Sequence, residues 1–320
     1  EILRKLAASS DVLIENYKVG GLRKYGLDYD SLSKVNPRLV YCSITGFGQT
    51  GPYSSRAGYD FLIQAMGGLM SVTGEAAEKP GGGPQKIGVA LSDILTGLYT
   101  MIGALSALAH RDKTGRGQHI DMALLDVTVA AMANQAMNYL IAGEAPTYMG
   151  NAHPNIVPYE AYQSADHHII LAIGNDGQFR RFCEVAGCAD LADDAAYSTN
   201  RARVENRNVL GVILREIILE KPREYWLEKL EKVGVPCGPI NNLQQIFDDP
   251  HVIARETQRE VKHPVAGSLP SVANPIRMSD VEISYDKAPP TLGQHNVEVL
   301  KGLLEFNDDD IERFRRAGVI

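Results

Sequence analysis

Apolar runs of strand length alternate with segments of helical spacing near the start of the chain, and this alternation limits the fold more than any other feature. The runs at residues 11–16 (DVLIEN) and 39–45 (LVYCSIT) suit strands that are buried in a parallel sheet. Residues 1–8 and 29–35 have helical patterning, and Asn36-Pro37 ends the second of these segments. Strands and helices that alternate over short connections predict an α/β fold.

The chain changes in character near residue 148. Before this point, long segments are apolar at helical spacing: residues 59–70, 94–110 and 122–141. After a loop-like stretch, the patterns predict strands 159–163 and 169–173, and helices 178–186, 206–220 and 223–233. We therefore expect a large domain over residues 1–147, a smaller α+β domain over residues 148–254, and a C-terminal return to the large domain over residues 255–320.

The composition argues against several classes of function. The net charge of −7 disfavours binding to nucleic acid, which requires a basic face, although a small anionic ligand needs only a local basic cluster. The four cysteines form no CxxC pair, so we expect reduced structural thiols and no metal site. The richest apolar stretch, residues 94–109, is shorter than the ~20 residues that a bilayer-spanning helix needs, and we expect no membrane association.

A glycine motif follows the second predicted strand. Gly46, Gly48 and Gly51 form a G-x-G-x-x-G pattern, which in a dinucleotide-binding fold leads directly into a helix. Here Gly51 precedes Pro52-Tyr53-Ser54-Ser55, which is the chemistry of a turn, and no second strand ending in an acid follows at the required distance. The motif therefore does not indicate a nicotinamide site.

Asp93 is the acid with the most informative position. It follows the apolar run at residues 87–91 and precedes a long apolar helix, so we expect its carboxylate at a helix N-terminus, where free amides stabilise the ionised form. A carboxylate there can act as a nucleophile that forms a covalent intermediate. Aspartate is also a common helix cap, and its position alone does not separate the two roles.

Other polar residues have both a functional and a structural interpretation. Lys18, Arg23 and Lys24 follow the end of the first strand, where open α/β sheets bind ligands, and such cations hold phosphates; a solvated helix face is the alternative. Tyr59 opens a helix and is otherwise a core tyrosine, and His153 in the loop GNAHPN is otherwise an ordinary loop histidine. No HExxH, Ser-His-Asp or GKS/T signature is present.

Ten short segments spread along nearly the whole chain form a joint pattern. They are residues 11–17 (DVLIENY), 36–41 (NPRLVY), 46–52 (GFGQTGP), 56–60 (RAGYD), 91–93 (LSD), 113–118 (KTGRGQ), 155–159 (NIVPY), 174–179 (GNDGQF), 234–242 (GVPCGPINN) and 289–295 (PPTLGQH). On these segments the chain resembles the family III CoA-transferases, which include formyl-CoA, carnitine and bile-acid CoA-transferases. Residues 41–46, 156–159 and 238–242 are most similar to the succinyl-CoA:glutarate and related dicarboxylate branch.

This resemblance implies a Rossmann-like large domain, a smaller domain and an interlocked homodimer. It implies that Asp93 moves CoA from an acyl-CoA donor such as succinyl-CoA to a carboxylic acid, through an aspartyl mixed anhydride and an aspartyl-CoA thioester. CoA is then a substrate, and no permanently bound cofactor is expected. The implied CoA-binding residues are Asn16, Tyr17, Lys18, Lys24, Arg56 and Tyr59, and the implied closing loop contains Gly150, Asn151 and His153.

The chain departs from the family pattern in two places. Family members usually begin with a strand-helix unit that contacts CoA, and we expect this unit to be absent because the chain opens at Glu1 within a helix-like segment. The closing loop is a run of glycines in formyl-CoA transferase, whereas this chain has Gly-Asn-Ala-His. No signal peptide is visible, so we expect the protein in the cytoplasm, or in the mitochondrial matrix of a eukaryote.

Two alternatives to CoA transfer fit the same resemblance. An α-methylacyl-CoA racemase needs two bases across the α-carbon, and such relatives carry a histidine where this chain has Tyr59. A catalytically incomplete acyl-CoA-binding protein would not need Asp93, which this chain retains. Both observations favour the transferase.

Overall fold

The chain forms two compact units in the computed structural model, which describes all of residues 1–320. The first unit comprises Glu1–Gly150 and His295–Ile320, and the second comprises Asn151–Gln294. Residues 255–294, for which the sequence predicts a return to the large domain, group with the second unit, and their hairpin strands form a separate two-stranded sheet. The domain ranges derived from the sequence stay a prediction.

A three-stranded parallel sheet lies at the centre of the first unit, in the order β1-β2-β3. The strands are β1 (Val12–Glu15), β2 (Val40–Thr45) and β3 (His119–Ala123). Their register pairs Val12 with Val40 and Tyr41 with His119, so the strands run side by side and end at a common edge. The predicted α/β fold with a parallel sheet is confirmed.

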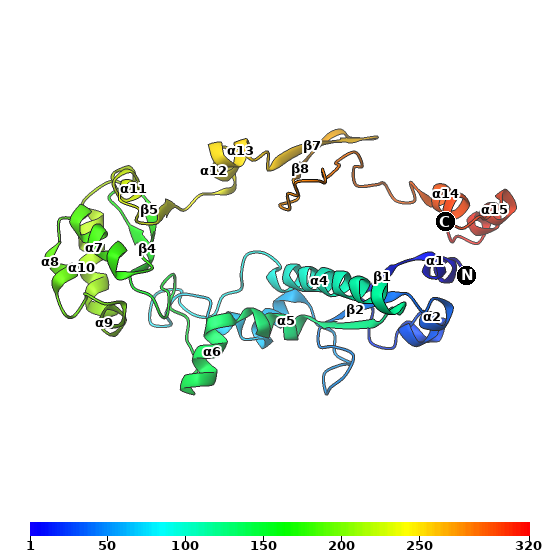
Figure 1. Ribbon diagram of the computed structural model, residues 1–320, viewed down its shortest axis with the longest axis horizontal. Coiled ribbons are helices and arrows are strands. Elements are labelled where there is room, and N and C mark those ends of the chain that lie inside the picture. Colours follow the sequence, from blue (N-terminus) through cyan, green and yellow to red (C-terminus); the bar gives the residue numbers. More distant parts are fainter. The chain divides into compact units, whose positions relative to one another are not determined.

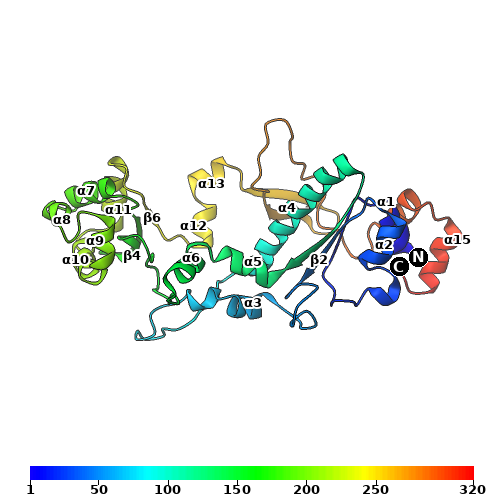
Figure 2. The same cartoon turned by 60° about the horizontal axis from the view of Figure 1, so that its bottom comes forward.

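Helices cover both faces of this sheet, as the alternation of side chains along β2 requires. Val40 and Cys42 face α4 (Leu91–Thr114), where they pack with Ala104 and Ala107. Tyr41 points to the opposite face, where it packs with residues of α1 (Ile2–Ser9) and α2 (Tyr29–Val35). Figures 1 and 2 show α4 lying alongside the sheet.

Shorter helices complete the first unit. They are η1 (Arg23–Tyr25), α3 (Asp60–Met66), η2 (Leu69–Ser71), α5 (Leu124–Ala131), α6 (Ala133–Ala142), α14 (Asn296–Glu298), η3 (Val299–Leu303) and α15 (Asp308–Arg316). The helix expected over residues 122–141 is divided: its first residues belong to β3, and a positive φ of 45° at Ala133 separates α5 from α6. The C-terminal helices bury Leu300 and Phe314 against Ile2 and Leu6 of α1.

Helix α4 is longer than the sequence indicated. It has 24 residues and, by length and composition alone, is apolar enough to cross a membrane, so the expectation that no segment reaches this length was wrong. The difference arises because the helix extends beyond residues 94–109 at both ends. Three of its polar side chains, Thr96, Thr100 and Arg111, are buried inside the unit, although only 28% of its most apolar window is buried.

The second unit contains a small antiparallel sheet, β4 (Tyr159–Gln163), β5 (His168–Ala172) and β6 (Cys237–Pro239), in sequence order. Its helices are α7 (Asp176–Val185), α8 (Asp190–Asp193), α9 (Asn200–Glu205), α10 (Arg207–Leu219), α11 (Arg223–Lys232), α12 (Leu243–Phe247) and α13 (Pro250–Ala254). Phe182 and Trp226 pack in the core between the sheet and these helices. A hairpin of β7 (Gln258–His263) and β8 (Gly267–Val272), which the sequence did not predict, follows α13.

Candidate active site

A cavity of about 410 Å³ opens at the carboxyl ends of the three parallel strands. Asn16 follows β1, Gly46 follows β2 and Leu124 follows β3, and all three line this cavity. Ligands of open α/β sheets bind at this edge, where the loops that leave the strands provide polar groups. We therefore regard the cavity as the candidate active site.

Asp93 lies in the first turn of α4 and lines the cavity. It is not the cap of this helix, because the N-cap position is Ala90, which offers no capping side chain. The cap comes from α3 instead: Asp60 Oδ1 accepts hydrogen bonds from the backbone amides of Ser92 (2.8 Å) and Asp93 (3.3 Å). The capping role that the sequence left open for Asp93 is therefore filled by Asp60.

The surroundings of Asp93 influence its charge. Partial burial, followed by the negative charge of nearby Asp60, raises the pKa of the Asp93 carboxyl above its usual value. A carboxylate with a raised pKa is more basic and binds a proton or an electrophile more readily than an ordinary aspartate. Thr96 and Gly97, at positions i+3 and i+4 from Asp93, line the same cavity. Helical spacing from Asp93 would have identified both residues in the sequence.

The loops after β1 and β2 supply further lining residues of the cavity. Asn16, Tyr17 and Lys18 line the cavity directly beyond β1, and the Tyr17 amide donates a hydrogen bond of 2.8 Å to the Glu15 carboxylate. Tyr17 is exposed over 62% of its surface, so its ring is accessible to a ligand. A backbone amide, an amide side chain, an aromatic ring and a cation are therefore close together on one short loop.

Arg56 and Tyr59 belong to the loop before α3 and also line the cavity. The Arg56 guanidinium lies 4.6 Å from the centroid of the Tyr53 ring and 5.3 Å from that of Phe47, which orients it by cation–π contacts. Tyr59 is 79% exposed, so the simpler interpretation of this residue as a core tyrosine was wrong.

The glycine motif has a structural explanation at this site. A Cβ atom on Gly46 would lie only 2.6 Å from Cα of Gly58, so the two backbones approach too closely for any side chain. Gly48 and Gly51 have positive φ angles of 84° and 87°, which glycine adopts without strain. The motif therefore brings the loop with Arg56 and Tyr59 against the end of β2, and no helix begins at Gly51.

The remaining predicted residues lie elsewhere in the described chain. Lys24 does not line the cavity, and its ammonium lies 4.8 Å from the centroid of the Tyr25 ring. Gly150 ends the first segment of the first unit, where its amide donates to the carbonyl of Gly74 at 2.8 Å. Asn151 and His153 belong to the second unit.

The segment around His153 is held by arginine and asparagine side chains of the second unit. Arg207 donates to the carbonyls of His153 (3.2 Å) and Pro154 (2.5 Å). Burial, followed by the positive charge of Arg207, lowers the pKa of His153 below its usual value, which favours the neutral imidazole. His153 is therefore a partly buried residue whose backbone is held by Arg207.

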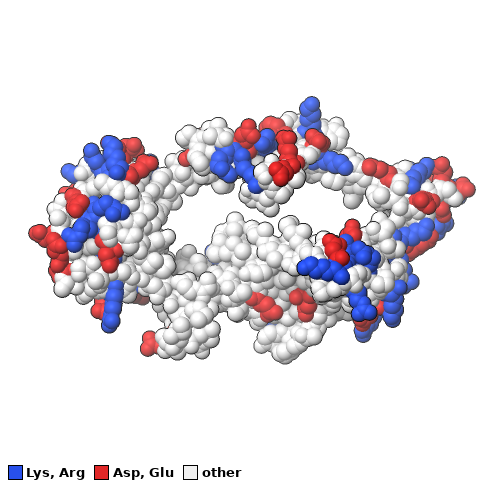
Figure 3. All heavy atoms as spheres, in the orientation of Figure 1, with Lys and Arg blue, Asp and Glu red and all other residues white.

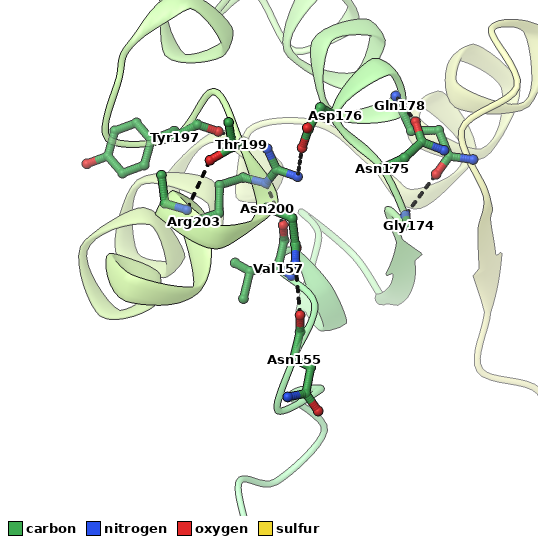
Figure 4. Close-up of polar contacts among 11 residues, drawn as sticks. Asn155, Val157, Gly174, Asn175, Asp176, Gln178, Tyr197, Thr199, Asn200 and Arg203 are labelled. Atoms are coloured by element: carbon green, nitrogen blue, oxygen red, sulfur yellow. Dashed lines mark hydrogen bonds and ion pairs between the residues drawn. The ribbon is translucent and has the colours of Figure 1, made fainter. Parts of the chain in front are cut away.

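The following residues are anchored in the same way (Figure 4). Asn200 donates to the carbonyl of Asn155 at 2.9 Å and accepts from the amide of Val157 at 3.2 Å. Arg203, which is fully buried, donates to the carbonyls of Val157 (2.6 Å) and Tyr197 (2.9 Å) and to the Asp176 carboxylate (2.8 Å). The segment after the predicted loop thus has a rigid attachment to α9.

Comparison with known proteins identifies the family of the chain. The sequence profile of CoA-transferase family III matches residues 1–296. The succinate–glutarate CoA-transferase of Agrobacterium fabrum is 49% identical over 94% of this chain and 74% of its own length. The human succinyl-CoA:glutarate CoA-transferase is 40% identical over 100% of this chain and 72% of its own length.

A solved structure shows the same fold. The crystal structure of a CAIB/BAIF family protein from Brucella suis superposes with a TM-score of 0.80 at 49% identity, covering 94% of this chain and 78% of that one. The resemblance inferred from the ten sequence segments is confirmed, as is the expectation of an enzyme. The chain belongs to CoA-transferase family III.

Proposed function

We propose that this protein transfers CoA from succinyl-CoA to a dicarboxylic acid such as glutarate, with Asp93 as the nucleophile. The observation that carries the proposal is the position of the Asp93 carboxylate: it lines a cavity at the carboxyl ends of the parallel strands and is not needed as a helix cap. The names of the A. fabrum and human relatives support the choice of acids.

The reaction proceeds in four balanced steps. The Asp93 carboxylate attacks the thioester carbonyl of the donor, which forms a mixed anhydride and releases CoA thiolate. The thiolate attacks the aspartyl carbonyl, which releases the donor acid and leaves an aspartyl-CoA thioester. The acceptor carboxylate attacks this thioester and again expels the thiolate, which finally attacks the acceptor carbonyl and regenerates the Asp93 carboxylate. Dividing the transfer in this way replaces one difficult step by several easier ones.

The other predicted residues have binding roles in this proposal. Lys18 and Arg56 supply positive charge for the phosphates of CoA, and Asn16, Tyr17 and Tyr59 supply hydrogen bonds and aromatic surface. Their common position on the cavity wall supports these roles. Lys24 has no such support from its position, and Gly150, Asn151 and His153 are proposed to form the closing loop on the strength of the resemblance alone.

The proposal extends to the assembly. We propose a homodimer, interlocked as the family resemblance implies, with a Rossmann-like large domain. The outer face of α4 supports an association, because Ile94, Leu98, Met101, Ile102 and Leu105 are all more than half exposed. In Figure 3 the surface over α4 and α5 carries few charged side chains. Large exposed apolar patches mark interaction surfaces.

The test is a transfer assay with a panel of acceptors. The purified protein is incubated with succinyl-CoA and glutarate, other dicarboxylates or monocarboxylates, and each new acyl-CoA is quantified by chromatography. We expect transfer to dicarboxylates, with Asp93→Ala as the inactive control. No new acyl-CoA with any acid, from a protein that is folded, would contradict the proposal.

The racemase alternative is tested in deuterated water. A racemase needs two bases across the α-carbon, and this chain has Tyr59 where such relatives carry a histidine. We expect no α-deuterium in 2-methylacyl-CoA incubated with the protein. Rapid deuterium incorporation without any acceptor acid would make Asp93 a base and favour the racemase.

A further inference from the structure

One fully buried amide side chain lies behind the turn that carries Asp93. Gln64, on α3, has no exposed surface. Its Nε2 donates to Asp60 Oδ2 at 2.7 Å and to the carbonyl of Val89 at 3.4 Å, and its Oε1 accepts from the amide of Ile87 at 3.0 Å. Burying a polar group costs free energy unless its hydrogen bonds are satisfied, and those of Gln64 are satisfied here.

Asp60 continues this network to the nucleophile. It lies one helical turn before Gln64, and its second oxygen accepts from the amides of Ser92 and Asp93. The Ser92 hydroxyl in turn accepts from Thr128 Oγ1 on α5 at 2.8 Å. Gln64 therefore holds the segment that enters α4, and Asp60 holds its first turn, so one pair of side chains on α3 fixes both ends of residues 87–93.

The charge of Asp60 adds a second effect. A carboxylate makes strong, charge-assisted hydrogen bonds to the free helix amides that it caps. The same negative charge disfavours ionisation of Asp93 and so increases its basicity. Gln64 keeps Asp60 in this orientation because its amide occupies the carboxylate oxygen that does not face the helix.

We propose that Gln64 and Asp60 are a positioning pair that sets the location and the charge environment of the Asp93 carboxylate for attack on the thioester. The pair does not touch the substrate, since neither residue lines the cavity. This inference rests on the proposed role of Asp93.

The test compares two substitutions of buried polar residues, only one of which affects the pair. Gln64→Met retains the volume and loses the hydrogen bonds. Thr100→Val is the matched control, because Thr100 is buried on α4 and bonds only to the carbonyl of Thr96. We expect Gln64→Met to lower kcat by about 10² with KM for acyl-CoA changed by less than about twofold, as for a displaced catalytic group. Thr100→Val should keep kcat near the wild-type value.

Two further variants, which remove the charge of Asp60 or move it to residue 64, separate the effect on the position of Asp93 from the effect on its basicity. Asp60→Asn places two amide donors face to face, at Nδ2 of the new side chain and Nε2 of Gln64, and removes the negative charge beside Asp93. Combining it with Gln64→Glu restores a donor–acceptor pair and keeps the amide of Ile87 bonded. We expect Asp60→Asn to lower kcat and to move the acid limb of its pH profile to lower pH, and the double variant to recover at least about tenfold in kcat.

Two results would overturn the inference. The first is a kcat for Gln64→Met equal to that of Thr100→Val, and the second is an unchanged acid limb in Asp60→Asn. Asp93→Asn is measured alongside to test the proposed nucleophile separately from the proposed positioning pair. If Asp93→Asn is inactive and Gln64→Met is normal, only the positioning pair is wrong; if Asp93→Asn still transfers CoA, the proposed nucleophile itself is wrong.

Discussion

At the scale of single residues, the chemistry of the site depends on the protonation of Asp93. Only the ionised carboxylate is a nucleophile, and burial together with Asp60 raises its pKa. Activity should therefore fall as the pH decreases through this raised pKa, so the acid limb of kcat should lie above the value of about 3.9 that is usual for aspartate. The measurement is kcat as a function of pH at saturating substrates. An acid limb at or below the usual value would contradict the assignment.

Lys18 is the cation whose position best suits a phosphate of CoA. It lines the cavity directly after β1, whereas Lys24 on the same loop region does not. We expect Lys18→Ala to raise KM for acyl-CoA about tenfold with kcat nearly unchanged, which is the effect of lost uniform binding. Lys24→Ala is the matched control and should raise KM less. A loss confined to kcat would place Lys18 outside the phosphate site.

At the scale of elements, Arg203 on α9 anchors the segment that follows the predicted closing loop. Its buried guanidinium bonds to the carbonyls of Val157 and Tyr197 and to Asp176, and Arg203→Met would leave these acceptors without their donor. We expect the free energy of unfolding to fall by about 3 kcal/mol, measured by urea denaturation. Arg201, on the same helix and 90% exposed, is the control, and Arg201→Met should have almost no effect. An equal decrease in the free energy of unfolding for both variants would contradict the anchoring role of Arg203.

The sequence predicts elements best where local patterns and tertiary structure agree. The strands β1 and β2 and the helices α2 and α11 lie where apolar periodicity and turn residues placed them. The β7–β8 hairpin was missed because its strands are largely exposed and carry Pro270, so they have no clear alternation. The division of α5 from α6 depends on the backbone at Ala133, which no propensity indicates.

At the scale of the whole molecule, the exposed apolar face of α4 predicts association. Burial of apolar surface contributes roughly 25 cal/mol per Å², so a pair of charges on this face should strongly disfavour an interface that uses it. We expect the protein to sediment as a dimer, and the double variant Ile102→Asp and Leu105→Asp to sediment as a monomer. Val209→Asp, at an exposed apolar position on α10, is the control and should leave the dimer intact. A monomeric wild-type protein would contradict the proposed assembly.

Part of the candidate site could be predicted from the sequence, because several of its residues lie in recognisable local patterns. Four of the residues that line the cavity stand in motifs at the ends of strands or at the starts of helices: Asp93, Asn16, Lys18 and Tyr59. Ligands of α/β sheets bind at these places, so the sequence position alone indicates that these residues face a ligand. Asp60 also stands in such a motif, residues 56–60, but its role and that of Gln64 depend on hydrogen bonds between α3 and the residues at the start of α4, which are distant in sequence. Which side chain caps α4 is a tertiary property, and it separates the two roles that the sequence left open for Asp93.

The central claim is that the Asp93 carboxylate becomes covalently acylated during CoA transfer, and trapping this intermediate tests it most directly. The protein is incubated with succinyl-CoA and hydroxylamine, digested, and its peptides are analysed by mass spectrometry, with Asp93→Asn as the control. Hydroxylamine attacks an anhydride or thioester at the aspartyl carbonyl and leaves a stable hydroxamate. We predict a hydroxamate on Asp93 that forms only with acyl-CoA present, together with loss of activity. Inactivation with the hydroxamate on another residue, or full transfer activity in Asp93→Asn, would contradict the account.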